Sequence, residues 1–291
     1  MNFILPGAIL LLMLSVGMSL KPSELVAHWR RLTWGSWSRL LLATFFMPPL
    51  LALALGQLFS LNLAATAGLF LIAVAPGAPL MTRGVAKKGF DLQLAASYQV
   101  WGALMIPIMI PLLVAAAGHL YQRDIWIPPL KLLGIVVKQQ FLPLLVGMAL
   151  MHFAPSFSTK VQRTFNLLGN LLLTIALVAL LWKLGPTLQQ TSPWIFVAAL
   201  LMAVGCLAIS RVLLSRQTPG VQTLVISNVN RHVGLALLLS GQYLQAKNTL
   251  PIIACYALAA PLVMALYAKL ARRNASALRE KSDDSSLTST S

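Results

Sequence analysis

The sequence predicts an all-α membrane protein that crosses the bilayer nine times. Hydrophobic residues make up 58% of the 291-residue chain and charged residues only 10%, whereas soluble domains carry about 25% charged residues. The apolar residues form runs of roughly 20 between short polar loops, which is the length that a helix needs to cross a bilayer. Two of the runs are interrupted by residues that break helices or carry charge.

The nine runs are expected to form one membrane domain over residues 1–273. They cover about 3–20, 38–57, 62–87, 90–118, 129–151, 165–184, 192–214, 218–245 and 249–272. The first run has no basic residue before it, which favours a retained helix over a cleaved signal peptide. Residues 274–291 are polar and rich in serine, so we expect a disordered cytoplasmic tail there.

The third and eighth runs are expected to be broken helices. The third contains "VAPGAPLMTRG", and Pro76, Gly77 and Pro79 do not all fit in one unbroken helix. The eighth carries a polar stretch from Ser227 to His232 between apolar flanks. Non-helical backbone at membrane depth is tolerated only where protein buries it or where it lines a water-filled cavity.

The positions of the two breaks predict inverted repeats. The eighth run follows the third at an offset of five spans, so spans one to four and six to nine overlay as two units of opposite orientation. Paired interruptions at corresponding positions of two halves indicate a transporter binding site near the bilayer midplane.

The distribution of basic residues predicts the orientation of the chain. With the N-terminus outside, 16 of the 22 Lys and Arg residues fall in cytoplasmic segments and 4 in outer ones. Cytoplasmic loops collect Lys and Arg, so we expect the N-terminus outside and the C-terminus in the cytoplasm, in the plasma (inner) membrane. The same rule explains the net charge of +16 without a nucleic-acid partner.

Two basic residues, Lys138 and Arg231, fall inside spans, and no Asp or Glu is placed near the bilayer centre. An unpaired charge at that depth costs at least about 2.5 kcal/mol, so water, backbone carbonyls or an anionic ligand must offset it. Arg231 either binds an anion through its planar fork or binds carbonyls that the broken helices leave free. Lys138 either contacts substrate or extends toward an interface or cavity.

Further polar residues near the breaks are candidate substrate ligands. His232 either binds substrate or is a neutral, hydrogen-bonded histidine. Asn228 and Asn230 satisfy backbone groups or contact substrate. Thr82 faces the first break, where a helix starting near Pro79 attracts anions through its N-terminus. Trp101, with Tyr98 and Gln99, either lines a cavity or faces lipid.

Several functions are not expected. The spans hold no paired carboxylates, metal cluster or nucleophile–base arrangement, so neither an enzyme nor a metal or cofactor site is predicted. Cys206 and Cys255 lie in apolar runs without metal-ligand spacing, and we expect them to be small buried hydrophobic residues.

An ordered set of motifs resembles the bile acid:sodium symporter family. It comprises "GMSLKPSEL" (17–25), "LLATFFMPPLLA" in the second span, "VAPGAP" at the first break, "VVKQQFLPLLVGMAL" in the fifth span and "ISNVNRHVGLAL" at the second break. The resemblance extends over most of residues 10–270. It implies a panel domain and a core domain, with the two broken helices crossing in the core at the substrate and sodium sites.

The chain departs from this family where sodium ligands are usual. Met81 and Thr82 replace Ser-Asn after the first break, and Thr44 replaces a glutamine on the second span. At the second break, Ser227 replaces a glutamate, and Arg231 and His232 replace a glutamine and an asparagine. We therefore hypothesise that Arg231 permanently supplies the positive charge that sodium supplies elsewhere, because like charges a few ångströms apart repel strongly at low dielectric.

The sequence thus predicts a secondary transporter that carries a small organic anion by alternating access without sodium. A sodium-coupled symporter with rearranged ligands is the first alternative. A non-transporting membrane sensor or assembly partner is the second.

Overall fold

The computed structural model describes residues 3–19, 33–77, 92–121, 129–189, 191–214, 221–243 and 246–288. Over these ranges the secondary structure is helical, without a β-strand. Each of the nine predicted spans contains helix among its described residues, and six of the described helices are long and apolar enough to cross a membrane. The chain is therefore an integral membrane protein, as predicted.

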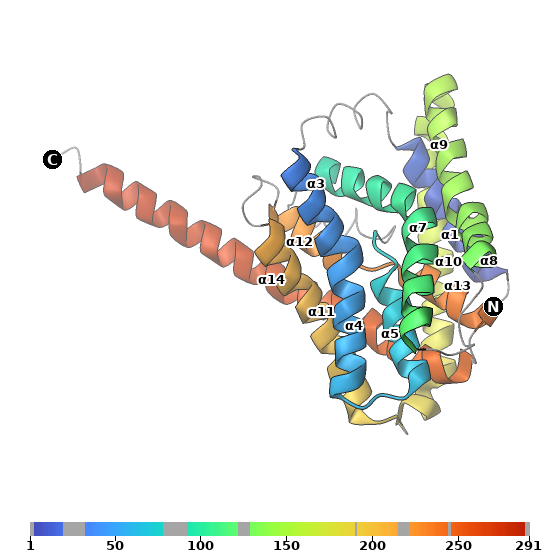
Figure 1. Cartoon of the computed structure of the whole chain (residues 1–291). Coiled ribbons are helices and arrows are strands. Elements are labelled where there is room, and N and C mark those ends of the chain that lie inside the picture. The colour runs from blue at the N-terminus through green and yellow to red at the C-terminus, as the bar shows by residue number, and fades with distance from the viewer. Residues whose placement is uncertain are drawn as a thin grey trace.

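The helices follow one another in the order of the predicted spans (Figure 1). Their bounds are α1 Ile4–Met18, α3 Trp34–Leu41, α4 Met47–Leu58, α5 Leu63–Ala73, α7 Leu92–Tyr121, α8 Pro129–Val136, α9 Leu142–Phe153, α10 Pro155–Gln189, α11 Pro193–Leu214, α12 Val221–Val229, α13 Val233–Tyr243 and α14 Ala246–Thr288. Two π-helical turns, η1 Leu42–Phe46 and η2 Val137–Phe141, join α3 to α4 and α8 to α9.

The helix of the third span ends, and the eighth span divides, at the positions where the sequence places the two breaks. Helix α5 begins at the cap Asn62, whose side chain accepts the Ala65 N–H at 2.8 Å, and it ends at Ala73. Residues 75–77 are then non-helical, and Gly77 has a φ of 75°, a conformation that glycine adopts without steric cost. The eighth span divides into α12 and α13 at residues 230–232.

The π-helical turn η1 has a cause in the sequence. The Met47 N–H bonds to the Leu42 carbonyl five residues back, which takes it away from the carbonyl of Ala43. The next two residues, Pro48 and Pro49, have no N–H to donate. The carbonyls of Ala43 and Thr44 therefore have no donor within their own helix and must find one elsewhere.

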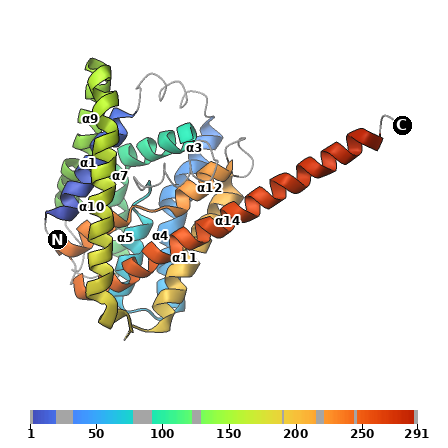
Figure 2. The same cartoon turned by 180° about the vertical axis from the view of Figure 1, so that it is seen from behind.

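The helices gather in two groups. Helix α1 packs against α9 and α10, and these three helices lie on the same side in Figures 1 and 2. Helix α11 packs against α4, α12 and α14 on the other side, and α5 packs against α4, α13 and α14. Helix α7 connects the groups because it contacts both α8 and α12.

A close backbone approach holds α1 against α9. A Cβ added at Gly17 would lie 2.2 Å from the Leu144 carbonyl oxygen, and one at Gly147 would lie 2.3 Å from the Leu14 carbonyl oxygen. Small residues at helix crossings in membranes let backbones approach in this way. On another face of α1, Gly169 of α10 receives the side chain of Leu12.

The C-terminal segment is drawn as a helix, and the disorder expected of residues 274–291 stays a prediction. Helix α14 continues without interruption to Thr288 and extends away from the bundle in Figures 1 and 2. Its sequence "LARRNASALREK" explains the helix, because Ala, Leu, Arg, Glu and Lys are all favourable in helices.

Candidate functional site

The two helix breaks meet directly inside the bundle. The backbone N–H of His232, at the second break, donates to the Ala75 carbonyl oxygen of the first break at 2.7 Å. The carbonyl of Val229, at the end of α12, accepts from the Tyr256 hydroxyl at 2.6 Å. The backbone groups that the breaks release are thus bonded to each other and to α14, rather than to lipid.

The His232 side chain caps α13. Its Nδ1 accepts the backbone N–H of Leu235 at 3.0 Å. An accepting Nδ1 places the ring hydrogen of the neutral imidazole on Nε2. Nε2 is buried and has no hydrogen-bond partner, so a donor remains available at the start of α13.

Arg231 is only 1% exposed and is held by backbone carbonyls. Its Nη1 donates to the Thr44 carbonyl oxygen at 2.8 Å and to the Ala73 carbonyl oxygen at 3.2 Å. The first carbonyl is one that the two prolines of α4 leave free, and the second belongs to the last turn of α5, where a helix has unbonded carbonyls and a partial negative charge.

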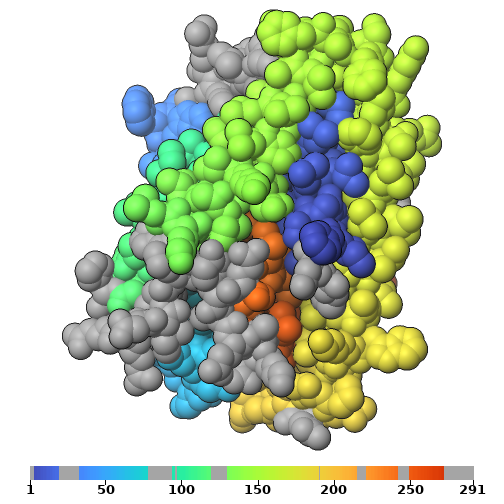
Figure 3. Space-filling view, turned by 90° about the vertical axis from the view of Figure 1, so that its right-hand side faces the viewer, coloured from blue at the N-terminus to red at the C-terminus, as the bar shows by residue number. Residues whose placement is uncertain are grey.

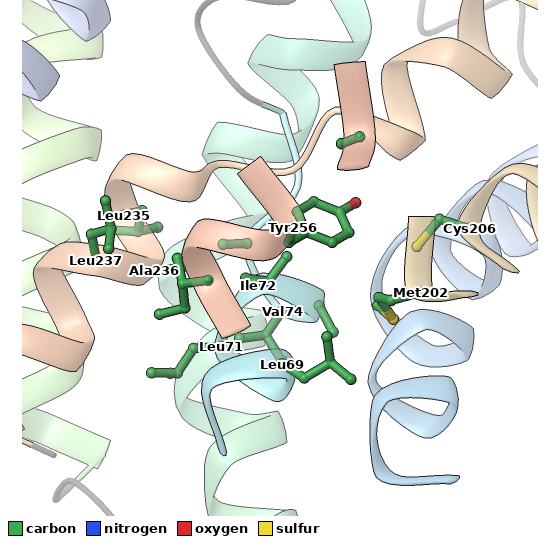
Figure 4. Packing of buried hydrophobic residues seen from close by; sticks show 14 of the residues in the cluster. Leu69, Leu71, Ile72, Val74, Met202, Cys206, Leu235, Ala236, Leu237 and Tyr256 are labelled. Carbon is green, nitrogen blue, oxygen red and sulfur yellow. The ribbon is translucent and has the colours of Figure 1, made fainter. Parts of the chain in front are cut away.

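The rest of the guanidinium has weaker contacts or none. Nη2 lies 3.9 Å from the Cys206 sulfur, and Nε has no partner. Figure 4 shows Cys206 on α11 facing Tyr256 across the core. In the part of the chain that the structure describes, no acidic side chain contacts Arg231, so carbonyl dipoles carry the compensation of its charge.

Asn228 connects α12 to η1, α11 and α7. Its amide nitrogen donates to the Ala43 carbonyl oxygen at 2.8 Å and to the Ser210 hydroxyl at 2.5 Å. Its amide oxygen accepts from the Tyr98 hydroxyl at 2.9 Å. The same Tyr98 hydroxyl lies 3.1 Å from the Thr44 hydroxyl. The second carbonyl released by the prolines of α4 is therefore also bonded from the second break.

We expect Asn228→Leu to lower the free energy of unfolding by about 3 kcal/mol, because it leaves the buried Ala43 carbonyl without a donor and removes one hydrogen bond each from the Ser210 and Tyr98 hydroxyls. Chemical unfolding of the purified protein in detergent measures this change. The control is Asn166→Leu on α10, where the asparagine is half-buried and makes one side-chain contact, with Asn170. Equal losses in the two variants would contradict the bridging role of Asn228.

The structure brings together most of the residues that the sequence singles out. Ser227, Asn228, Arg231 and His232 are buried around the point where the breaks meet, beside Pro76 and Gly77. Asn230 is half-buried at the break itself. Lys138, by contrast, is exposed on η2 and does not contact Arg231. Thr82 and Pro79 lie outside the described residues.

Other buried polar residues were given less weight by sequence reasoning or were missed. Tyr98 and Trp101 are each 3% exposed, and Trp101 packs on the rings of Trp37 and Phe45, so neither faces lipid. Gln99 on α7 and Gln140 on η2 are fully buried, and neither amide has a partner. The sequence feature that could have identified Gln99 and Gln140 is the occurrence of a glutamine inside an apolar run.

The fold and the site define a class: a polytopic helical membrane protein in which two broken helices meet at a buried polar centre, as in secondary transporters. The family model of the Sodium Bile acid symporter family matches residues 6–190. The chain therefore belongs to that family, which makes it a membrane transporter rather than an enzyme. No curated protein matches the chain. The family match includes the first break and ends before the second.

Proposed function

We propose that this protein carries a small organic anion across the membrane without sodium, by alternating access around the point where the two helix breaks meet. One observation supports this more than any other. A buried guanidinium, that of Arg231, donates to two backbone carbonyl oxygens, one from η1 and one from the end of α5.

Such a position is chemically a cation site. Backbone carbonyl oxygens can replace the hydration shell of a metal ion in membrane proteins. Here the carbonyls of Thr44 and Ala73 bind a cation that is covalently part of the chain. A sodium ion at the same carbonyls would lie within a few ångströms of the guanidinium and be strongly repelled.

The burial of Arg231 defines how it would act on an anion. Because its side chain is 1% exposed and Nη1 is bonded to carbonyls, Arg231 attracts an anion through its field rather than by direct contact. Direct contacts fall to polar groups at the breaks, foremost the free Nε2 of His232 and the unbonded hydroxyl of Ser227. Asn230 and Thr82 remain candidates, and Lys138 is placed to meet an anion only at the exposed surface of η2.

The grouping of the helices suggests the moving parts. We assign α1, α8, α9 and α10 to a panel domain and the helices around the two breaks to a core domain, related internally by inverted repeats. Movement of one against the other exposes the site to either side in turn. We place the N-terminus outside and the C-terminus in the cytoplasm of a plasma (inner) membrane.

Initial uptake of a radiolabelled carboxylate into proteoliposomes is expected to be equal in sodium, potassium and choline buffers. Cholate, a bile acid, and benzoate serve as probes, with protein-free liposomes as the control. An uptake rate that rises about tenfold or more with sodium, comparable to a typical coupling of sites, would reject the fixed-cation mechanism in favour of the sodium-coupled alternative. Absence of uptake of either probe in all buffers would count against carboxylate transport.

A further inference from the structure

The amide of Gln99 is the least satisfied polar group beside the meeting point of the breaks. Gln99 is fully buried in α7, and neither its oxygen nor its nitrogen has a hydrogen-bond partner. Most buried polar side-chain atoms in proteins have a partner, so an amide without one requires an explanation.

Contacts along α7 place Gln99 at the first break. A Cβ added at Gly77 would lie 3.4 Å from the Gln99 carbonyl oxygen and 3.9 Å from its Cγ, so the glutamine side chain begins against Gly77. One turn further along α7, Gly102 faces Pro76 in the same way, at 3.8 Å. This face of α7 therefore runs along the non-helical residues of the first break.

The same region holds the free donor of His232. The His232 backbone N–H bonds to Ala75, two residues before Gly77. In addition, Tyr98, the neighbour of Gln99, bonds to Asn228 of α12 at 2.9 Å. Gln99 of α7 and His232 at the start of α13 thus both contact residues 75–77, and each carries a buried polar group without a partner, the Gln99 amide and His232 Nε2.

We propose that the Gln99 amide is a direct ligand of the transported anion and donates, together with His232 Nε2–H, to its carboxylate group. This inference rests on the proposed function and names the chemistry of that site. Both groups offer N–H donors, the start of α13 is the positive end of a helix, and the field of Arg231 lies behind them. A carboxylate can accept both hydrogen bonds, and it carries the negative charge that the field of Arg231 favours. An ester or a cation lacks that negative charge.

Helix α13 reaches the surface of the molecule at one place. In Figure 3 part of it (orange) is visible between the segment around α8 (green) and α1 (blue). Residues 234–240 of α13 are nevertheless buried, as are His232 and Gln99.

Thermal unfolding of the protein in lipid nanodiscs, with cholate or benzoate and with their uncharged methyl esters, tests the proposal. We expect the carboxylates and not the esters to raise the Tm of the wild-type protein. In Gln99→Leu we expect the Tm without ligand to be unchanged or higher, because an unpartnered buried amide is removed, and the affinity for carboxylate to fall about tenfold or more. Gln99→Glu is expected to abolish the stabilisation, because a carboxylate in the site repels the ligand.

A matched control removes a buried and unpartnered group elsewhere. Ser158 of α10 has a buried hydroxyl without a partner, and Ser158→Ala should retain the full response to carboxylate. If Gln99→Leu unfolds at a lower temperature and still responds like the wild type, Gln99 is structural and the proposal is wrong. If Gln99→Glu retains binding, the amide does not donate to a carboxylate. If no carboxylate stabilises the wild-type protein, the proposed anion function fails with it.

Discussion

Arg231→Met is expected to abolish carboxylate transport and to lower the free energy of unfolding by about 2–5 kcal/mol. Methionine fills the volume but leaves the carbonyls of Thr44 and Ala73 without a donor, and hydrogen bonds to charged groups are worth about 1.5–3 kcal/mol each. Uptake into proteoliposomes and chemical unfolding measure the two effects.

Rescue by a free cation tests whether Arg231 takes the place of a bound cation or has only a structural role. In Arg231→Ala the carbonyls should bind methylguanidinium, or sodium, and either ion should restore part of the stability and the transport. Arg211→Ala, which removes an exposed arginine of α11, is the control and should respond to neither ion. Normal transport by Arg231→Ala without any added cation would contradict the role of the guanidinium.

Gly147→Ala should destabilise the protein by about 3 kcal/mol, at the upper end of what overpacking usually costs. The added methyl group would meet backbone atoms of α1, the Leu14 oxygen at 2.3 Å and the Gly17 Cα at 2.9 Å. Backbone atoms cannot change rotamer to make room, so α1 and α9 must separate along their whole contact.

The control lies in the preceding helix of the same span. Gly134 of α8 has nothing within 4 Å of an added Cβ, and Gly134→Ala should stabilise the protein by up to about 1 kcal/mol through helix propensity. Thermal unfolding of both variants tests the crossing. Equal stability of the two variants would show that α1 and α9 are not packed as closely as described.

Local sequence patterns predicted the helices and both breaks because their causes are local. The apolar runs, Pro76 with Gly77, and the polar stretch from Ser227 to His232 each act on neighbouring backbone. Two residues of the site, Arg231 and His232, could therefore be identified from the sequence as polar groups at a break. The sequence also showed that a buried Arg231 needs carbonyls or an anion to offset its charge.

The hydrogen-bond partners of Arg231 and Asn228 could not be predicted from the sequence, because they depend on contacts between distant segments. The sequence does not say that carbonyls released by Pro48 and Pro49 meet Arg231 and Asn228, more than 180 residues later. Lys138 shows the related problem of helix rotation. A lysine within an apolar run can face the interior or the surface, and only the packing of η2 against α1 and α7 leaves it exposed.

The covalent attachment of the Arg231 guanidinium has an energetic consequence for a carrier. A dissociable cation can cross with its substrate and cancel the substrate's charge, but the Arg231 guanidinium stays with the protein. A monovalent anion carried alone moves one net negative charge, so transport is electrogenic. With about 100 mV, negative inside, this amounts to about 2.3 kcal/mol, or an outward concentration ratio of about 50. Under such a voltage the proposed mechanism drives net export of the anion unless its outside concentration exceeds the inside concentration by more than this ratio.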